Sequence, residues 1–577
     1  MKKQLFVLFC FLTLLSVKVL ALPITREVNG IWYSLDSKEL TAEVTQPVGS
    51  DIYTYYSGVV NVPSTVTYEG NSYTVIAINN RAFMGQGNLT TIIIPKTVKI
   101  IDYEAFSGCT SLQSVVFSSN GVLEKIERRA FEGCSITSLN LPNSLISIGE
   151  DAFKGCEYLK SIKGGDNIEI LGNNIFQGCI SLTDMVIPKS VKKIGDYAFW
   201  ECRNLKSVTM NEGLEIIGNG AFLQCQMLDK VNFSNTVKEI GWEAFRWCIN
   251  LKQIEIPNSV VKMGYGIFRY CTWLESIKLS ESITEIPGYA FEQTSLKSIQ
   301  IPNSVKIIMP FAFRDCSYLK DVVWSNSLAE IGEQAFLNTG IEYVDFPESL
   351  FKIGGSAFAK CDKLEEVSIP YKTTVISDGA FSECKQLTSV FNYSVTPQTI
   401  PYTNSPFSSS GNPIVHVYEG LKELYASNIG WEQAIVNGIS IVDDIPALKA
   451  TSITVDNSSY NCGIGETGQA TATVLPKNTF KKDLSWSSSD ESILHVDEIT
   501  GQFVGLEDGQ AIITVTTTDG TNLQATAIVN VGQQTDIKTP VGYDVKHSAN
   551  YNIYGQRITN PIKGLYIING KKYIYYK

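Results

Sequence analysis

The chain has 577 residues, of which 44% are hydrophobic and 18% charged, a composition typical of folded domains and long enough for several of them. Its formal net charge of −11 disfavours a nucleic-acid-binding surface, which would need clustered basic residues. Only three histidines occur and none precedes His416, which removes most Ser/His/Asp, Cys/His and zinc-type sites from the first 415 residues.

Residues 1–21, MKKQLFVLFCFLTLLSVKVLA, place two lysines before an apolar run that ends at Val19-Leu20-Ala21. This pattern predicts a secretory signal peptide with cleavage near Ala21. The run is short for a membrane span, and no later segment offers 18 consecutive apolar residues, so we expect no transmembrane span. The sequence therefore predicts an exported protein, either released or held at the cell surface on the outer membrane.

A repeat organises the next part of the chain. One phenylalanine, called here the anchor, recurs every 22 to 25 residues: Phe83, Phe106, Phe131, Phe153, Phe176, Phe199, Phe222, Phe245, Phe268, Phe291, Phe313, Phe336, Phe358 and Phe381. Each unit holds one extended segment of the type LxxIxIP, a second of the type SVxxIG, and an AFxxC corner. A single unit cannot bury its apolar side alone, so the units must stack. We predict a mainly β, right-handed solenoid of about 14 turns built from short parallel strands.

The repeat unit resembles a known family. The stretch LPNSLISIGEDAFKGCEYLKSI is similar to the BspA-type leucine-rich repeat of bacterial surface proteins, and the resemblance covers residues 76–391. The flanking residues 22–75 and 392–445 resemble the N-terminal and C-terminal caps of that family, and a solenoid needs polar caps over its end turns. The resemblance implies a recognition or adhesion surface.

Eleven of the 13 cysteines lie three residues after an anchor: Cys109, Cys134, Cys156, Cys179, Cys202, Cys225, Cys248, Cys271, Cys316, Cys361 and Cys384. In the turns on either side of Cys316 the same position holds Thr294 and Thr339, so Cys316 has no neighbour to oxidise with. Stacked side chains also point the same way, which is poor geometry for a disulfide. We expect a ladder of buried free thiols; the alternative is that some adjacent pairs are oxidised. A column with one thiol per turn does not converge tetrahedrally, so no metal site is expected.

A glycine stands four residues before the anchor in eight units: Gly149, Gly172, Gly195, Gly218, Gly241, Gly264, Gly332 and Gly354. A required positive φ would explain it, but Pro287 occupies the same position in another unit and argues against a strict rule. We interpret these glycines as tight corners and not as a phosphate loop.

Some units depart from the repeat in a way that indicates function. The two positions after the anchor are mostly polar or glycine, whereas in mid-array they include aromatic and arginine side chains. Exposed aromatics beside arginine suit a platform for sugar stacking or for anchoring a protein. The alternative is that they pack on one another to cover an edge of the solenoid. The candidate ligand-binding residues are Trp200, Trp242, Arg246, Trp247, Arg269 and Tyr270.

The C-terminal third changes to alternating strand patterns with Thr, Ser and Gly turns. The stretch WSSSDESILHVDEITGQFVGLEDGQAIITV resembles a bacterial Ig-like domain of the Big type, which we place at residues 446–533, with Trp486 in its core. Residues 534–577 read as a polar linker and a tail that resembles the C-terminal sorting signal of type IX secretion in Bacteroidetes. Asn569-Gly570 predicts a hairpin there. The alternative is one extra hairpin packed on the Ig-like domain.

These patterns favour a non-catalytic, monomeric surface protein. We expect it to bind a host or bacterial surface protein or a glycan along the solenoid. An alternative is a glycan-capture protein of a polysaccharide-uptake system. An enzyme is disfavoured, because the repeat region lacks histidine and shows neither a paired-carboxylate site nor a nucleotide loop. No catalytic residue and no cofactor is expected.

Overall fold

The computed structural model describes residues 23–48, 55–400, 405–476, 479–480 and 482–532, together with the backbone of four short strands between residues 550 and 575. The chain divides into two compact units, Met1–Ala447 and Leu448–Lys577. The predicted signal peptide at residues 1–21 lies outside the described residues. Within those residues no helix is long and apolar enough to cross a membrane.

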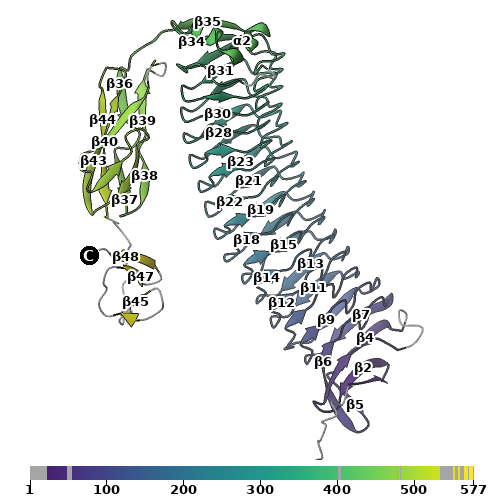
Figure 1. Cartoon of the computed structure of the whole chain (residues 1–577). Coiled ribbons are helices and arrows are strands. Elements are labelled where there is room, and N and C mark those ends of the chain that lie inside the picture. The colour runs from purple at the N-terminus through teal and green to yellow at the C-terminus, as the bar shows by residue number, and fades with distance from the viewer. Residues whose placement is uncertain are drawn as a thin grey trace, which may run out of the picture. The chain divides into compact units, whose positions relative to one another are not determined.

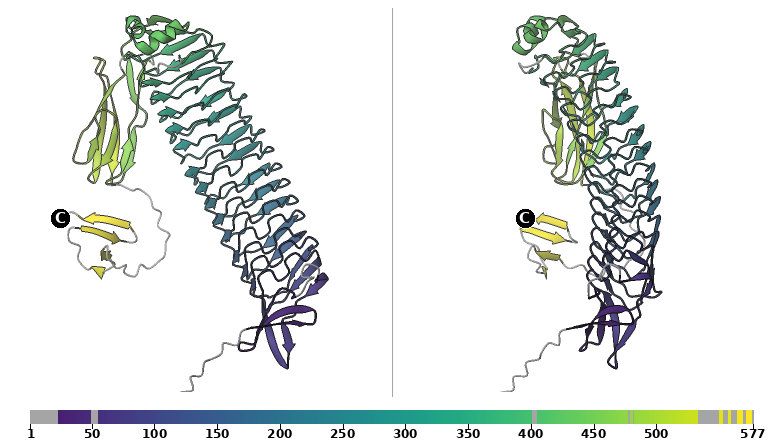
Figure 2. Two further views of the ribbon diagram at one scale, coloured as in Figure 1. Left: turned by 45° about the vertical axis from the view of Figure 1, so that its right-hand side comes forward. Right: turned by 90° about the vertical axis from the view of Figure 1, so that its right-hand side faces the viewer.

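The first unit is a solenoid whose turns stack one on the next between two caps (Figure 1 and Figure 2). One face carries two-residue strands that pair in parallel, turn on turn, in register. In most of them the first residue is exposed and the second is buried, as in Lys193 and Ile194, which is the period of a half-buried strand. These strands are β8 (Ile100–Ile101), β10 (Lys125–Ile126), β12 (Ser147–Ile148), β14 (Ile170–Leu171), β16 (Lys193–Ile194), β18 (Ile216–Ile217), β20 (Glu239–Ile240), β22 (Lys262–Met263), β24 (Glu285–Ile286), β26 (Ile307–Ile308), β28 (Glu330–Ile331), β30 (Lys352–Ile353) and β32 (Val375–Ile376).

A second face carries the longer strand of each turn, and these strands also pair in parallel. They are β7 (Asn88–Ile94), β9 (Ser114–Phe117), β11 (Ser138–Leu141), β13 (Ser161–Gly164), β15 (Asp184–Val186), β17 (Ser207–Thr209), β19 (Lys230–Asn232), β21 (Gln253–Glu255), β23 (Ser276–Lys278), β25 (Ser298–Gln300), β27 (Asp321–Val323), β29 (Tyr343–Asp345), β31 (Glu366–Ile369) and β33 (Ser389–Asn392). The two extended segments read from each repeat unit are therefore the two strands of each turn.

The anchor phenylalanines form the centre of the core. All are at most 1% exposed, and the rings of successive turns stack, for example Phe199 on Phe222 with centroids 5.2 Å apart and planes 3° from parallel. The stack continues beyond the repeat, because Tyr56 lies 4.6 Å from Phe83 and Phe407 lies 5.6 Å from Phe381. The predicted solenoid is confirmed, with about 16 turns where about 14 were expected.

The eight repeat glycines are explained by close approach and not by a left-handed backbone. None of the eight has a positive φ. A Cβ added at Gly264 would lie 2.3 Å from the backbone nitrogen of Trp242 in the preceding turn, and one at Gly195 would lie 2.7 Å from that of Asn173. In these eight turns the backbone approaches that of a neighbouring turn too closely to leave room for a Cβ, whereas the turn with Pro287 carries a side chain at this position.

The caps close both ends of the ring stack. The N-terminal cap contains β1 (Ile24–Val28), β2 (Ile31–Asp36), β3 (Thr41–Val44), β4 (Ser57–Asn61), β5 (Thr65–Tyr68) and β6 (Asn71–Ile78). The C-terminal cap contains β34 (Ile414–Tyr418), α1 (Lys422–Ala426), α2 (Ile429–Val436) and β35 (Ser440–Ile445). Strands β34 and β35 extend the second face in parallel, and the fully buried Trp431 of α2 lies against Phe407 and Tyr425.

The second unit begins with an Ig-like sandwich. Its strands are β36 (Ser452–Val455), β37 (Ser459–Cys462), β38 (Thr467–Gln469), β39 (Ala472–Leu475), β40 (Leu484–Ser488), β41 (Leu494–Val496), β42 (Gln502–Gly505), β43 (Gly509–Thr517) and β44 (Gln524–Val531). Trp486 is buried in the core with Leu494 and Phe503, as predicted. His495 lies in β41 with its Nδ1 2.7 Å from Glu491, so it is a strand residue.

The tail contains β45 (Asn550–Asn552), β46 (Arg557–Ile558), β47 (Gly564–Ile568) and β48 (Lys571–Tyr575). Strands β47 and β48 pair antiparallel from Gly564 opposite Tyr575 to Ile568 opposite Lys571. This is the hairpin that Asn569-Gly570 predicts, although those two residues themselves lie outside the described part of the chain.

Candidate ligand-binding edge

The AFxxC corner gives each turn two left-handed residues. They stand two before and two after every anchor, and all 28 have φ between 51° and 73°. A side chain in this conformation costs about 1–2 kcal/mol, and the first five turns place glycine in the later position: Gly85, Gly108, Gly133, Gly155 and Gly178. Apart from the buried anchor and the buried residue before it, the residues from three before to two after each anchor line one edge of the solenoid, called here the corner edge.

Trp247 and Tyr270 occupy the later left-handed position, at φ 63° and 62°. Positive φ is unusual for bulky residues, and such residues persist where packing holds them. Their rings contact each other, with centroids 4.7 Å apart. Trp247 is 38% exposed and Tyr270 is half-buried, so the pair lies at the surface with one ring supporting the other.

The two predicted arginines belong to the same cluster. The guanidinium carbon of Arg269 lies 4.7 Å from the ring centroids of both Tyr270 and Tyr289, so the side chain is held between two rings. Its Nε donates a hydrogen bond to the buried carboxylate of Glu292. Arg246 lies 5.4 Å from Tyr270 and donates to Glu243 over 2.8 Å. Both positive charges are therefore balanced within the cluster.

Three aromatic residues of this cluster were not predicted. Tyr265 lies 4.7 Å from Tyr289, and Tyr289 stacks on Phe311 at 4.4 Å. They stand three or two residues before their anchors, where residue type varies widely, so only their aromatic character could have marked them. Partial burial and a hydrogen bond with Tyr289 raise the pKa of Tyr265 to about 12, which keeps this exposed phenol neutral.

The structure does not bring Trp200 into this cluster. Its ring lies 5.7 Å from Tyr197, and its buried Nε1 has no hydrogen-bond partner among the described residues. Trp242 belongs to the same turn as Trp247 and is 65% exposed, with its backbone nitrogen donating to Oδ1 of Asn219 one turn earlier. We define the aromatic cluster as Trp242, Arg246, Trp247, Tyr265, Arg269, Tyr270, Tyr289 and Phe311.

The aromatic cluster combines packed and exposed side chains. Arg269, Tyr270 and Tyr289 pack on one another, as edge packing requires. Trp242, Trp247 and Tyr265 keep much of their rings in solvent. The result is a charge-balanced surface with partly exposed aromatic rings, some of which rest on neighbouring side chains.

Comparison with protein families identifies both parts of the chain. The family described as "BspA type leucine rich repeat region" matches residues 76–206, 192–308 and 284–410, which together exceed half of the chain. The family described as "bacterial Ig-like domain (group 2)" matches residues 449–545.

Similar individual proteins were also found. Two uncharacterized proteins of Clostridium acetobutylicum are 38% identical over 98 residues and 35% identical over 89 residues, which cover 17% and 15% of this chain. The matches span only 24% and 9% of those relatives. A solved leucine-rich repeat protein from Bacteroides ovatus is 29% identical with a TM-score of 0.49, covering 63% of this chain and 94% of that one. A leucine rich cell surface protein from Faecalibacterium prausnitzii is 25% identical with a TM-score of 0.36, covering 60% and 94%.

Proposed function

Because the chain belongs to the family of BspA-type leucine-rich-repeat proteins, we propose that it is an exported surface protein that binds a macromolecular ligand along its solenoid. Both matched families are non-catalytic binding folds, and BspA-type proteins are typically found at the cell surface or secreted. The protein acts as a monomer and needs no cofactor.

The aromatic cluster is the proposed centre of the binding surface. The observation that carries this proposal is the placement of Trp247 and Tyr270 in left-handed positions that five other turns give to glycine. Two large rings in that conformation cost free energy that neighbouring side chains must offset. Covering the edge of the solenoid does not require large rings at this position, because the first five turns have glycine there.

The ligand is a host or bacterial surface protein, with an uncharged glycan as the second candidate. The internal pairing of Arg246 and Arg269 with carboxylates favours a neutral contact in either case. A glycan ligand would make the protein a capture component of a polysaccharide-uptake system. Binding of the mature chain to a glycan array and to a panel of extracellular-matrix proteins distinguishes a glycan ligand from a protein ligand.

The proposal is tested with Trp247→Ala against the best binder from that screen. We expect a loss of about 2 kcal/mol or more in binding free energy, the range of an interface hot spot, with little change in melting temperature. The matched control is Trp273→Ala, because Trp273 is also exposed and lies close in the sequence but contacts Lys252 away from the cluster. Unchanged binding with lowered stability would mean that the cluster only packs the edge.

A further inference from the structure

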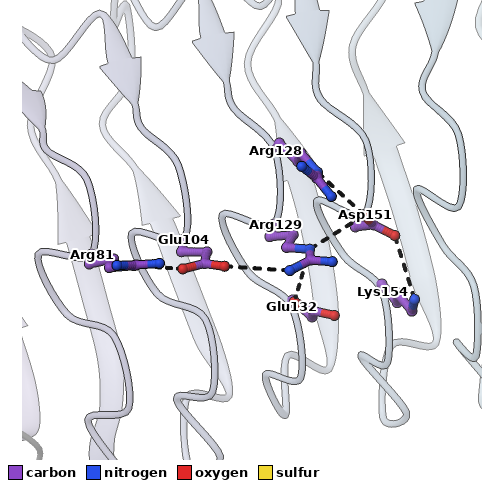
Figure 3. Close-up of polar contacts among 7 residues, drawn as sticks. All are labelled: Arg81, Glu104, Arg128, Arg129, Glu132, Asp151 and Lys154. Carbon is purple, nitrogen blue, oxygen red and sulfur yellow. Dashed lines mark hydrogen bonds and ion pairs between the residues drawn. The ribbon is translucent and has the colours of Figure 1, made fainter.

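A charged ladder lies on the corner edge of the first turns, well before the aromatic cluster. Arg81, Glu104, Arg129 and Asp151 each stand two residues before an anchor and alternate in sign along the solenoid (Figure 3). The Nε of Arg81 donates to Glu104 over 2.7 Å. Arg129 then bridges Glu104 at 3.6 Å and Asp151 at 3.5 Å. Successive turns are therefore tied together by ion pairs.

The two signs of charge are not equally accessible. The Asp151 side chain is 7% exposed and Glu104 is also buried, whereas Arg128 is 51% exposed and Arg81 nearly as much. Asp151 alone is shared by three cations, because Arg128 and Lys154 approach it to 3.7 and 3.6 Å in addition to Arg129. Glu104 and Asp151 therefore lie beneath the surface, whereas Arg81 and Arg128 lie on it. We call Arg81, Arg128, Arg129 and Lys154 the basic strip.

The charges of these turns are balanced in number but differ in exposure. The basic strip carries four positive charges, and Glu104, Glu132, Asp151 and the exposed Glu150 carry four negative ones, on a chain whose net charge is −11. In the aromatic cluster each arginine has a carboxylate partner and is covered by rings. Arginine presents a planar fork that binds carboxylate and sulfate groups in two-point fashion.

The residues that follow the basic strip on the same edge indicate the ligand. The next turn presents the half-buried amides of Asn174 and Gln177, and the turn after it presents the Tyr197–Trp200 pair. Cations, amides and rings in this order suit the acidic groups, the hydroxyls and the apolar ring faces of a sugar chain. An acidic peptide would account for the cations alone.

We propose that the basic strip is an anion-binding subsite for an acidic polysaccharide that runs along the corner edge. Arg81 and Arg129 stand two turns apart, about 10 Å at strand spacing, so a polymer with acidic groups repeated along its length meets both. Its carboxylate or sulfate groups bind the outward guanidinium and ammonium groups, while Glu104 and Asp151 hold those groups in place from below. This subsite is separate from the aromatic cluster and does not depend on what that cluster binds.

The test is titration of the mature chain with heparin, polygalacturonate, dextran and poly-L-glutamate. We expect binding of one or both acidic polysaccharides, weakened by added salt, and no binding of dextran at this site. The double variant Arg128→Gln/Lys154→Gln should weaken that binding by about tenfold or more, since each removed group is a charge-assisted donor. Arg129 still neutralises Asp151 in this variant, so the turns stay paired.

Lys320→Gln is the matched control, because Lys320 is an exposed lysine elsewhere on the solenoid that is paired one-to-one with Glu342. Its affinity for the acidic polysaccharide should equal that of the unaltered chain. The proposal is overturned if neither acidic polysaccharide binds, if the double variant binds as the unaltered chain does, or if poly-L-glutamate binds as tightly as the polysaccharides. Loss of ligand binding in Trp247→Ala alone bears on the proposed function and leaves this subsite intact.

Discussion

The thiol of Cys225 donates a hydrogen bond to the carbonyl oxygen of Phe199 in the preceding turn, with the sulfur and oxygen 3.2 Å apart. The same bond to the previous anchor occurs at every one of the eleven repeat cysteines. The carbonyl oxygen of Phe199 also accepts the backbone N–H of Cys202 in its own turn. In two turns without cysteine, the hydroxyls of Thr294 and Thr339 lie 3.3 and 3.2 Å from the sulfurs of Cys316 and Cys361 in the following turn.

We predict that the repeat thiols are reduced and unreactive in the folded protein. Each S–H is used in a buried hydrogen bond, and burial raises the pKa of Cys316 to about 12, so almost no thiolate forms at neutral pH. Alkylation of the folded chain followed by mass spectrometry should modify the partly exposed Cys462 alone among the described cysteines. After unfolding without reductant, all eleven should be alkylated. Recovery of most of them as disulfides would contradict the ladder.

Gly264→Ala should destabilise the solenoid by more than about 1–3 kcal/mol, the usual cost of forcing extra atoms into a packed region. The new methyl group would meet backbone atoms of Gly241 and Trp242, which cannot rotate away. Gly87→Ala is the matched change, because its methyl group would meet only the Thr110 hydroxyl at 3.7 Å. That variant should stay within about 1 kcal/mol of the unaltered chain. Equal denaturation midpoints for the two variants would refute the close-approach explanation.

Asp519 should make the Ig-like domain sensitive to acid. Partial burial of the side chain opposes ionisation, but hydrogen bonds from the Thr521 hydroxyl and the Ala450 N–H outweigh it and lower the pKa of Asp519 to about 2. Because this value lies below the ordinary one of 3.8, the contribution to stability is complete above about pH 4 and is lost as pH falls through 2. Asp519→Asn should lower the unfolding free energy of the Ig-like domain at pH 7. It should also reduce the decrease in that free energy between pH 4 and pH 2. Hydrogen exchange of β43 and β44 measures both effects. If the variant and the unaltered chain lose stability equally between pH 4 and pH 2, Asp519 is not the group responsible.

Removal of residues 540–577 should leave the solenoid folded and change where the protein is found. The reason is the resemblance of the tail to a sorting signal, together with its place in the other compact unit. Surface labelling and fractionation of the native host compare the truncated with the full-length chain. A truncated chain that reaches the surface at an unaltered level would support the alternative, in which the tail is one more hairpin beside the Ig-like domain.

The repeat was predictable from the sequence because its recurring residues form the core, where packing restricts the residue type. Anchors such as Phe222 must be large and apolar to stack, and Cys225 must be small and donate, so both recur at a fixed spacing. The two additional turns were missed because Tyr56 and Phe407 lie in the caps, where the chain between rings is longer and the AF pair is absent. Their role is visible only from the rings that they contact.

The corner edge was less predictable because residue type there depends on the backbone conformation and on contacts with side chains of adjacent turns. Two residues before the anchor, a left-handed backbone is shared by Arg129, Asn174 and Tyr289, whose side chains differ in charge and size. The glycines of the first five turns were the available signal for a left-handed position. That Arg269 lies between Tyr270 and Tyr289 depends on contacts between turns, which a linear pattern does not contain.

The stacking of strands across the solenoid has a mechanical consequence. The hydrogen bonds between paired strands, such as those between β16 and β18, join one turn to the next and run along the direction in which the turns stack. Tension applied between the two ends of the solenoid would therefore load these bonds in series and open them turn by turn. Each turn from Phe199 to Phe222 holds 23 residues, so each opening releases about 80 Å of chain. Under tension, such a solenoid would extend in steps. Each opened turn would absorb work and so limit the rise of the force on a bound ligand.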